Sequence, residues 1–307
     1  MTACPGCEQD TPLAAHGVLA PFVAELMGLP LGLRVGYREC ASCGLGFFDY
    51  RYTQSQIERL YDGYRGADYF RIRRSWEPWY RADVNDAYAP GSPAVEDRVR
   101  FASEILVRGG LKGPLECAVD FGGDQGQFFP DVVPIKRRVV VELSGQPLLP
   151  GVERVPSLES LSERPDLVVV AHVLEHLGDP RALLTEIHRT LDSSGLLYVE
   201  VPLERPRVRG WHRSRPYAGW VRGVTGRRWS FIPVDFASGV SRQLGWKIPR
   251  LGVVKESEHI NFFTPASLAS LLEACGFEIT AERSEPNART GALRLGRLGM
   301  SAVPRAR

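Results

Sequence analysis

The segment that most constrains the fold is a short apolar strand ending in a glycine-rich turn, Ala118-Val-Asp-Phe-Gly-Gly-Asp-Gln-Gly126. Glycines in such a turn let backbone N–H groups approach a ligand closely, and sites of this kind lie at the carboxyl ends of parallel strands. A second apolar strand, 138–143, carries Glu142, 22 residues after Asp120. An acidic side chain there can accept both hydroxyls of a ribose. The pair predicts an adenosine-containing cofactor, with a nicotinamide dinucleotide and S-adenosylmethionine as candidates.

Short apolar strands alternate with helices around this turn. Further strands are predicted at 166–171, 196–201 and 277–279, and helices at 99–107, from Asp179-Pro180 and from Thr264-Pro265. In these helices apolar residues recur every three or four positions. Apolar strands separated by helices indicate a parallel sheet covered on both faces, so the predicted fold class is α/β.

Four of the six cysteines form two C-x-x-C pairs, Cys4 with Cys7 and Cys40 with Cys43. Each pair presents two thiolates to one metal, so two pairs can complete a tetrahedral zinc site in a reducing compartment. The alternative is a redox pair, because the 32 residues between the pairs exceed the usual ribbon spacing. The other two cysteines stand in apolar surroundings and are predicted to be buried.

Breaks in composition divide the chain. Pro90-Gly-Ser-Pro93 marks a boundary, and a basic stretch interrupts the α/β pattern after residue 203. The predicted parts are a small zinc-binding module at 1–50, an aromatic and arginine-rich cap or connecting segment at 51–94, an α/β domain at 95–282 with a basic insertion at 204–257, and a basic tail at 283–307.

The formal net charge of +2 hides an uneven distribution. The insertion at 204–257 holds 12 Lys and Arg against 3 Asp and Glu, and the segment 283–307 holds 6 against 1. The insertion also contains four tryptophans. Three interpretations compete, in this order: a lid over an anionic or nucleotide-linked sugar, a patch for a membrane surface, and a nucleic-acid surface. Plain solvated structure is the remaining alternative.

The chain shows no secretory signal, and its apolar stretches end far short of the ~20 residues that span a bilayer. We therefore expect a cytoplasmic protein. Contact through 204–257 would place it peripherally at the inner face of the membrane.

Three further segments narrow the choice of cofactor: 166–180, with His172, Glu175 and His176; 195–202; and 258–264, which begins Glu-His-Ile-Asn. With the cysteine pairs and the aromatic segment 61–80, they resemble class I S-adenosylmethionine-dependent methyltransferases. More narrowly, they resemble the zinc-ribbon-bearing branch found in sugar and surface-polysaccharide biosynthesis. The resemblance implies a Rossmann-like methyltransferase domain, S-adenosylmethionine as cofactor and structural zinc. It also implies a small acceptor, a sugar hydroxyl or carbon in a nucleotide-linked or polysaccharide precursor.

The residues expected to bind the cofactor follow from this pattern and are Asp120, Gly122, Gly123, Asp124, Gly126, Glu142 and His172. The sequence departs from the family at Asp124, which stands where the family turn has its middle glycine. Asp124 can bind the ammonium group of the cofactor or crowd its pocket, and we favour the first.

Transfer to a hydroxyl or an enolisable carbon needs a base. Histidine suits this role because its ordinary pKa is near 6.5. We name His259 first and His172 second, with Glu200 or Glu204 as orienting partners, so the predicted catalytic residues are His259, His172 and Glu200. The spacing of His172 and His176 also matches a metal pair, but no third ligand is evident nearby. The alternative functions are a non-catalytic cofactor-binding protein and an RNA-directed, zinc-containing methyltransferase.

Overall fold

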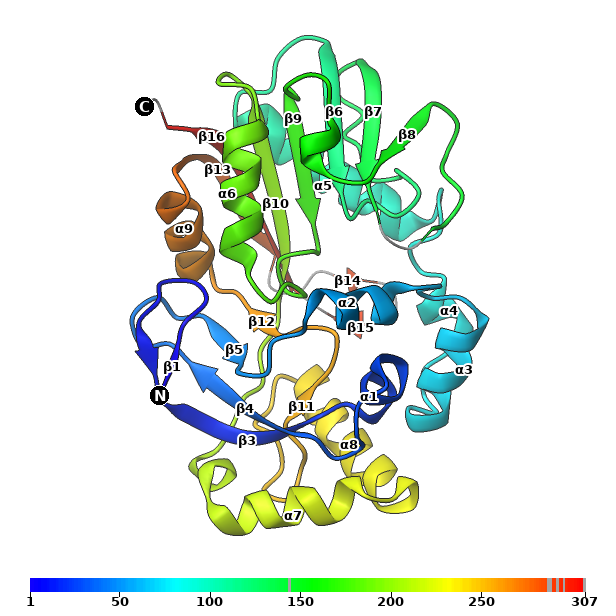
Figure 1. The fold of residues 1–307 in the computed structure, drawn as a ribbon, viewed down its shortest axis with the longest axis vertical. Helices are drawn as coiled ribbons and strands as arrows, with labels where there is room; N and C mark the ends of the chain where they lie inside the picture. The colour runs from blue at the N-terminus through cyan, green and yellow to red at the C-terminus, as the bar shows by residue number, and fades with distance from the viewer. Residues whose placement is uncertain (143–144, 286–288, 291–292, 295, 306–307) are drawn as a thin grey trace.

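A seven-stranded sheet forms the upper half of the molecule (Figure 1). The computed structural model describes residues 1–142, 145–285, 289–290, 293–294 and 296–305. The strand order is β13-β16-β10-β9-β6-β7-β8. Neighbours among β6 to β10 are parallel, and β16 is antiparallel to both β10 and β13. The strands are β6 (Leu115–Phe121), β7 (Ile135–Val141), β8 (Val152–Val155), β9 (Leu167–Ala171), β10 (Leu196–Leu203), β13 (Phe277–Glu285) and β16 (Gly296–Pro304).

Residues on these strands alternate between two apolar cores. Val168 and Val170 lie in the core that includes α6 (Pro180–Thr190) and α9 (Pro265–Ala274), whereas Leu167 and Val169 lie in the core that includes α5 (Pro93–Arg108). Successive side chains of a strand point to opposite faces, so both faces of this sheet are buried. A short 3₁₀ helix, η1 (Leu158–Ser160), precedes β9.

Local capping explains where the helices begin. Asp179 accepts a hydrogen bond from the Ala182 backbone N–H at the start of α6, and Thr264 accepts one from Ser267 at the start of α9. Both helices begin where the sequence predicts. The predicted helix at 99–107 is longer in the structure, because Ser92 caps it and Pro93 occupies its first position.

The segment 283–307 was expected to be a basic tail, and the structure corrects this expectation. Residues 277–285 and 296–304 form β13 and β16, which extend the main sheet beyond β10. Leu298, Met300 and Ala302 are at most 1% exposed. Alternation of these apolar residues with Arg297 and Ser301 is a strand pattern, and the high net charge concealed it.

The lower half contains a second, five-stranded sheet with the order β11-β3-β4-β5-β12. It joins segments far apart in the sequence, since β11 ends the basic insertion and β12 follows it, while β3 to β5 lie before residue 50. Its strands are β3 (Leu13–Leu19), β4 (Arg34–Glu39), β5 (Gly46–Phe48), β11 (Lys255–Glu256) and β12 (Asn261–Phe262). Two small hairpins complete the strands: β1 (Thr2–Ala3) with β2 (Asp10–Thr11), and β14 (Arg289–Thr290) with β15 (Leu293–Arg294).

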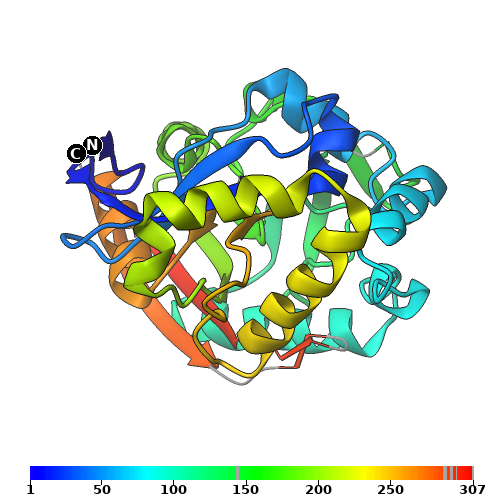
Figure 2. The ribbon, with the colours of Figure 1, turned by 90° about the horizontal axis from the view of Figure 1, so that it is seen from below.

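Helices from three parts of the sequence cover this second sheet. Figure 2 shows the two insertion helices crossing the lower face of the molecule. Tyr217 and Phe231 of the insertion share one buried core with Phe22 and Trp76. The helices are α1 (Pro21–Met27), α2 (Gln54–Tyr61), α3 (Ala67–Trp76), α4 (Ala82–Asn85), η2 (Gly210–Arg213), α7 (Arg215–Thr225) and α8 (Arg228–Gln243).

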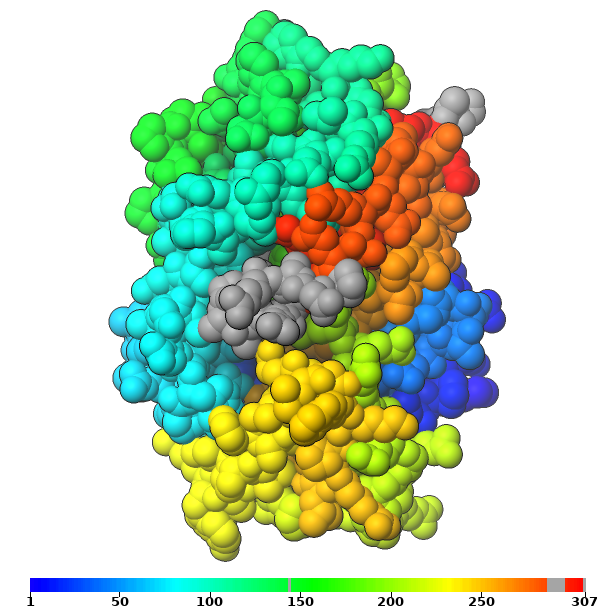
Figure 3. Space-filling model, turned by 180° about the vertical axis from the view of Figure 1, so that it is seen from behind, coloured from blue at the N-terminus to red at the C-terminus, as the bar shows by residue number. Residues whose placement is uncertain are grey.

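The rear face shows how these parts meet in space (Figure 3). The aromatic segment 51–94 and the insertion flank the lower lobe, and β13 and β16 lie above the insertion. Among the described residues, no helix is both long and apolar enough to cross a bilayer.

The burial of β16 can be tested by a single truncation. Met300→Ala should lower the free energy of unfolding by about 2 to 5 kcal/mol, because it leaves a cavity in a fully buried strand. Arg305→Ala, at an exposed position just after β16, should change it by less than about 0.5 kcal/mol. Urea denaturation measures both, and equal small effects would contradict the strand assignment.

Candidate functional site

The turn after β6 takes a path that requires its glycines. Gly122 and Gly126 have φ of 71° and 84°, in the left-handed region that residues with a Cβ rarely adopt. A Cβ on Gly122 would also lie 2.7 Å from the Val173 side chain, so the turn packs against the loop after β9. Asp124 occupies the middle position with φ of 54°, which Asp tolerates better than most residues.

Asp124 and Glu142 meet where β6 and β7 end. The Asp124 backbone N–H donates to Glu142 Oε2 at 2.8 Å, and Gln127 Nε2 donates to Asp124 Oδ2 at 3.1 Å. Burial raises the pKa of Asp124. Two of the acidic residues expected to bind the cofactor therefore lie side by side at the carboxyl ends of parallel strands, as the strand order requires.

Asp120 lies beneath the same turn. It is 1% exposed, and its Oδ2 has no hydrogen-bond partner among the described residues. Burial raises the pKa of Asp120 to about 8, although nearby Arg98 opposes this effect. A Cβ on Gly123 would lie 2.3 Å from Asp120 Oδ2, so only glycine lets the chain fold this closely over the carboxylate.

Arg98 is a buried residue of this site that sequence reasoning missed. Its guanidinium lies over the Phe128 ring at 4.2 Å, and its Nε is 3.4 Å from Glu200 Oε1. The helix predicted at 99–107 began one residue too late to include it. Its spacing from Val95 and Ala102 on the buried stripe of α5 was the available signal.

His172 and Glu200 are brought together at the ends of β9 and β10. His172 Nε2 is 3.0 Å from Glu200 Oε1, and His172 Nδ1 is 3.2 Å from Glu175 Oε1. Burial would lower the pKa of His172, but the two carboxylates raise it. Burial would raise the pKa of Glu200, but Arg98 and His172 lower it to about 2. Arg98, Glu200, His172 and Glu175 therefore form a buried network in which positive and negative groups alternate.

The loop after β9 is tied to the segment that leads into β12. The backbone N–H groups of Ile260 and Asn261 donate to Glu175 O at 2.8 and 3.0 Å. Asn261 Nδ2 donates to Leu174 O and Leu177 O at 2.8 and 2.9 Å. The predicted sites at 172–176 and 258–261 are therefore parts of one surface.

His259 and His176 form a second histidine group on this surface. Their ring centroids are 4.7 Å apart, and His176 Nδ1 donates to Glu258 O at 2.9 Å. His259 Nδ1 pairs with the Glu204 carboxylate. Burial would lower the pKa of His259, but Glu204 raises it to about 9. Of the two predicted orienting partners, Glu204 pairs with His259 and Glu200 with His172.

Aromatic side chains of the segment 51–94 border these histidines. Tyr61 packs edge-on against His176 at 5.8 Å, and Tyr64 packs against Tyr61 at 4.9 Å. The Tyr69 hydroxyl donates to the Glu258 carboxylate. Arg65 lies over the Tyr64 ring at 5.2 Å. The segment thus provides an aromatic wall beside His176, and the half-buried guanidinium of Arg65 lies against that wall.

The four paired cysteines converge near the N-terminus. Cys4 Sγ lies 3.7 Å from Cys43 Sγ, Cys7 Sγ lies 3.5 Å from Cys40 Sγ, and the four sulfur atoms all lie within 4.8 Å of one another. Thiolates bound to tetrahedral zinc at ~2.3 Å lie about 3.8 Å apart. All six cysteines are free thiols. The donor set and its spacing therefore fit zinc.

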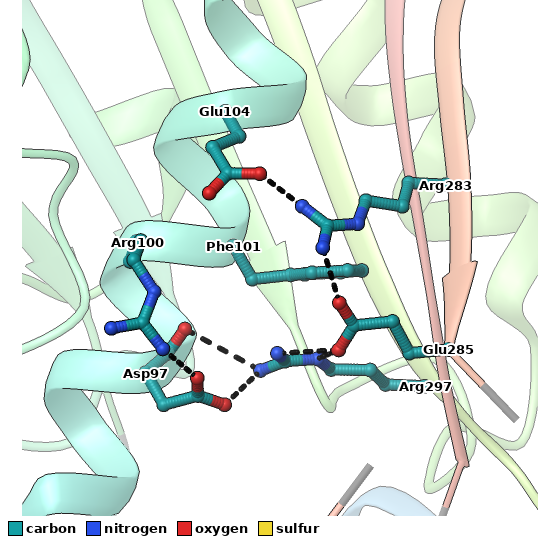
Figure 4. A pocket seen from close by; sticks show the side chains of 7 residues that line it. All are labelled: Asp97, Arg100, Phe101, Glu104, Arg283, Glu285 and Arg297. Atoms are coloured by element: carbon teal, nitrogen blue, oxygen red, sulfur yellow. Dashed lines mark hydrogen bonds and ion pairs between the residues drawn. The ribbon is translucent and has the colours of Figure 1, made fainter. Parts of the chain in front are cut away.

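A surface cavity lies elsewhere, between α5 and strands β13 and β16 (Figure 4). It measures about 390 Å³. Arg297 bridges Asp97 and Glu285, and Arg283 bridges Glu285 and Glu104, so the charged groups that line it already pair with one another. The residues that line this cavity form a closed ion-pair network, and the cavity is not part of the site at the strand ends.

A family model described as a methyltransferase domain matches residues 93–282, more than half of the chain. The sheet order, the glycine turn and the acidic residue at the end of β7 define the class: a Rossmann-like, cofactor-binding α/β enzyme. The chain belongs to the methyltransferase-domain family, and it is an S-adenosylmethionine-dependent methyltransferase. The fold and the enzyme class predicted from the sequence are thus confirmed.

Solved structures of methyltransferases are similar to the chain at low identity. The 1,6-didemethyltoxoflavin-N1-methyltransferase of Burkholderia thailandensis is 16% identical, with a TM-score of 0.45, over 87% of this chain and 97% of that one. The N-methyltransferase NodS of Bradyrhizobium japonicum is 13% identical, with a TM-score of 0.39, over 70% and 99%. None of the curated proteins compared with the chain matches it.

The close fit of Gly123 over Asp120 predicts a strong effect on cofactor binding. Gly123→Ala should weaken S-adenosylmethionine at least tenfold, because the new Cβ must displace the Asp120 carboxylate and the turn above it. Gly239→Ala, in α8 with open space around it, should leave the affinity unchanged. Calorimetric titration measures both, and equal affinities would show that this turn does not contact the cofactor.

Proposed function

We propose that the protein methylates a sugar carried in a nucleotide-linked or polysaccharide precursor. The observation that carries this proposal is the wall of tyrosines beside the histidine pair, with Arg65 against the wall. Aromatic rings offer flat apolar faces to a sugar, and a guanidinium can bind phosphate through two contacts. The wall and His259 belong to the lower lobe and His176 to the upper one, which suits a small acceptor bound where the two lobes meet.

The chemistry is a displacement at a methyl carbon, for which S-adenosylmethionine supplies the sulfonium leaving group. In this proposal Asp120, Asp124 and Glu142, together with the backbone of the turn, bind the cofactor. The protein then holds the acceptor in line with the methyl group and excludes water. Such positioning can supply ~7 to 11 kcal/mol.

We assign removal of the acceptor proton to His259. Its Nδ1 is held by Glu204, which leaves Nε2 for another partner, and the carboxylate stabilises positive charge on the ring. Both ring nitrogens of His172 already face carboxylates. His172 and Glu200 are therefore positioning residues in this proposal.

His259→Gln should lower turnover by about 10²- to 10⁴-fold and leave the affinity for S-adenosylmethionine unchanged, because the side chain acts on the acceptor. His188→Gln, on α6, is the matched control and should retain full turnover. Steady-state kinetics and calorimetry measure the two properties. Unchanged turnover in His259→Gln would remove this residue from the mechanism.

The acceptor class is tested by mass spectrometry of sugar nucleotides and glycans from cells with and without the gene. The proposal expects one species to lose a single methyl group, 14 Da, when the gene is deleted. Identical profiles, with the purified protein still binding the cofactor, would favour a binding protein without turnover. Methylation of RNA, with an affinity that falls steeply with salt, would favour the RNA-directed alternative.

We also propose that Cys4, Cys7, Cys40 and Cys43 bind a structural zinc ion. Three of these residues are at most 8% exposed and belong to the same core as α9. Four thiolates fill a tetrahedral shell and leave no open position for a substrate. Arg181 Nη2 of α6 donates to Gly6 O at 2.6 Å, and this bond holds the turn between Cys4 and Cys7 against the lobe of the main sheet.

Cys43→Ser should lose the zinc ion and lower the melting temperature, since metal binding contributes directly to folding in such sites. Cys275→Ser should keep one zinc ion per chain, because Cys275 lies apart from the four-sulfur cluster. Plasma mass spectrometry counts the metal and calorimetry gives the melting temperature. Full zinc content in Cys43→Ser would exclude these ligands.

The insertion 204–257 carries a surface that suits anionic lipid. Trp229, Phe236 and Val240 lie on one exposed stripe of α8, spaced by seven and four residues, and Trp229 is 73% exposed. The insertion is strongly basic, and a helix with exposed tryptophan and phenylalanine among arginines is typical of one that lies in a membrane interface. We propose that this stripe contacts the headgroups of an anionic membrane, where lipid-linked glycans are made.

Co-sedimentation with vesicles tests this surface. The protein should bind phosphatidylglycerol vesicles and not phosphatidylcholine vesicles, and the Trp229→Ser/Phe236→Ser variant should bind at least tenfold more weakly. Val107→Ser, an exposed apolar position on α5, is the control. Unchanged vesicle binding would exclude the stripe, and lower turnover without a change in vesicle binding would favour the lid.

A further inference from the structure

Three side chains of ligand type converge beside the proposed acceptor site: Glu175, His176 and His259. Their nearest ligand atoms all lie within 4.8 Å of one another. The first two come from the loop after β9, and His259 comes from the segment before β12. Because the two N–H groups of residues 260 and 261 both donate to Glu175 O, the backbone itself holds the three together.

The Glu175 carboxylate is fully buried and only partly paired. It is 0% exposed; its Oε1 faces ring nitrogens, and its Oε2 has no hydrogen bond to the described residues. The groups nearest Oε1 are ring nitrogens, His172 Nδ1 at 3.2 Å and His176 Nε2 at 3.9 Å. A buried carboxylate is costly unless it is paired, hydrogen-bonded or bound to a metal. The pairing with His172 leaves room for a further positive partner.

The two histidines of the cluster, His176 and His259, are oriented as metal-binding histidines usually are. His176 Nδ1 contacts Glu258 O, which can only accept, so this nitrogen carries the proton and Nε2 keeps its lone pair. His259 Nδ1 is held by the Glu204 carboxylate in the same manner. Ligating histidines commonly donate their second nitrogen to a carbonyl or a carboxylate, which fixes the tautomer and the ring orientation.

We propose that Glu175, His176 and His259 bind a divalent transition-metal cation. Two imidazoles and one carboxylate suit Zn²⁺, Mn²⁺ or Fe²⁺, and three protein ligands leave positions open for water or substrate. Ligands ~2.1 Å from a tetrahedral cation lie about 3.4 Å apart, so a closure of roughly an ångström brings the three side chains to binding distance. This site differs from the cysteine cluster in both its donors and its open positions.

The inference rests on the proposed function and changes the role of His259 in it from proton acceptor to metal ligand. The acceptor hydroxyl takes an open position, where the cation stabilises its anionic form. The O–H bond releases its proton to water, the oxygen forms a bond to the methyl carbon, and the electron pair of the broken C–S bond stays on sulfur. His259 then contributes Nε2 as a ligand, and Glu204 keeps the ring in place.

The test uses the full chain with its cysteine site loaded with zinc, and Mn²⁺ as the probe, because hard Mn²⁺ is poorly bound by thiolates. Electron paramagnetic resonance of free Mn²⁺ should show one bound ion per chain. Glu175→Gln and His176→Gln should each weaken binding at least tenfold, and His188→Gln should not. Binding of S-adenosylhomocysteine and circular dichroism check that each variant is folded. Calorimetry with Zn²⁺ repeats the titration for the softer cation.

Two results would overturn the inference: no saturable binding of Mn²⁺ or of a second Zn²⁺, or binding that both ligand variants retain. The failure of the inference can be told apart from a failure of the proposed function. If no cation binds but His259→Gln still abolishes turnover, the imidazole acts alone and sugar methylation stands. If a cation binds and no sugar is methylated, the site stands and the acceptor class is wrong.

Discussion

The side-chain amide of Asn261 ties together the parts from which the site is built. It is 1% exposed, donates both N–H groups to carbonyls of the loop after β9, and accepts from Arg51 Nη2 at 2.8 Å. Arg51 also donates to Gly178 O at 3.0 Å. One buried amide thus joins the glycine-turn lobe, the second sheet and the aromatic segment. Together with the backbone bonds of Ile260 and Asn261 to Glu175 O, these bonds hold His176 and His259 in contact.

Buried charge organises the other side of the site. Arg98 enters from α5 beneath the strand ends and faces Glu200, which in turn faces His172. Charges removed from water need partners at close range, and here each carboxylate has a cation on one side. The network fixes the orientation of the His172 ring, and the same ring faces Glu175 of the neighbouring cluster. The cofactor side and the acceptor side are therefore linked by one chain of ion pairs.

Sequence reasoning succeeded where the signal was local. The glycine turn, the two C-x-x-C pairs and the capped helices α6 and α9 depend on residues a few positions apart. It was less successful where partners are distant. Arg98 and Glu200 are about a hundred residues apart, and the strand β16 was hidden in a segment whose charge suggested a tail. The parts predicted at 1–50, 51–94 and 204–257 meet in one core, and segments from the first and the last share one sheet, because no single part buries its apolar residues alone.

By itself, the sequence determined the class of the protein: an α/β methyltransferase whose turn after β6 and acidic residue after β7 suit an adenosine-containing cofactor, with four cysteines spaced for zinc. Residues close together in the sequence determine local backbone conformation and the spacing of neighbouring ligands. Only the tertiary structure decided which histidine faces which carboxylate, and that Glu175, His176 and His259 share one buried position. Such contacts arise when separate segments pack together, and residue order alone does not specify that packing.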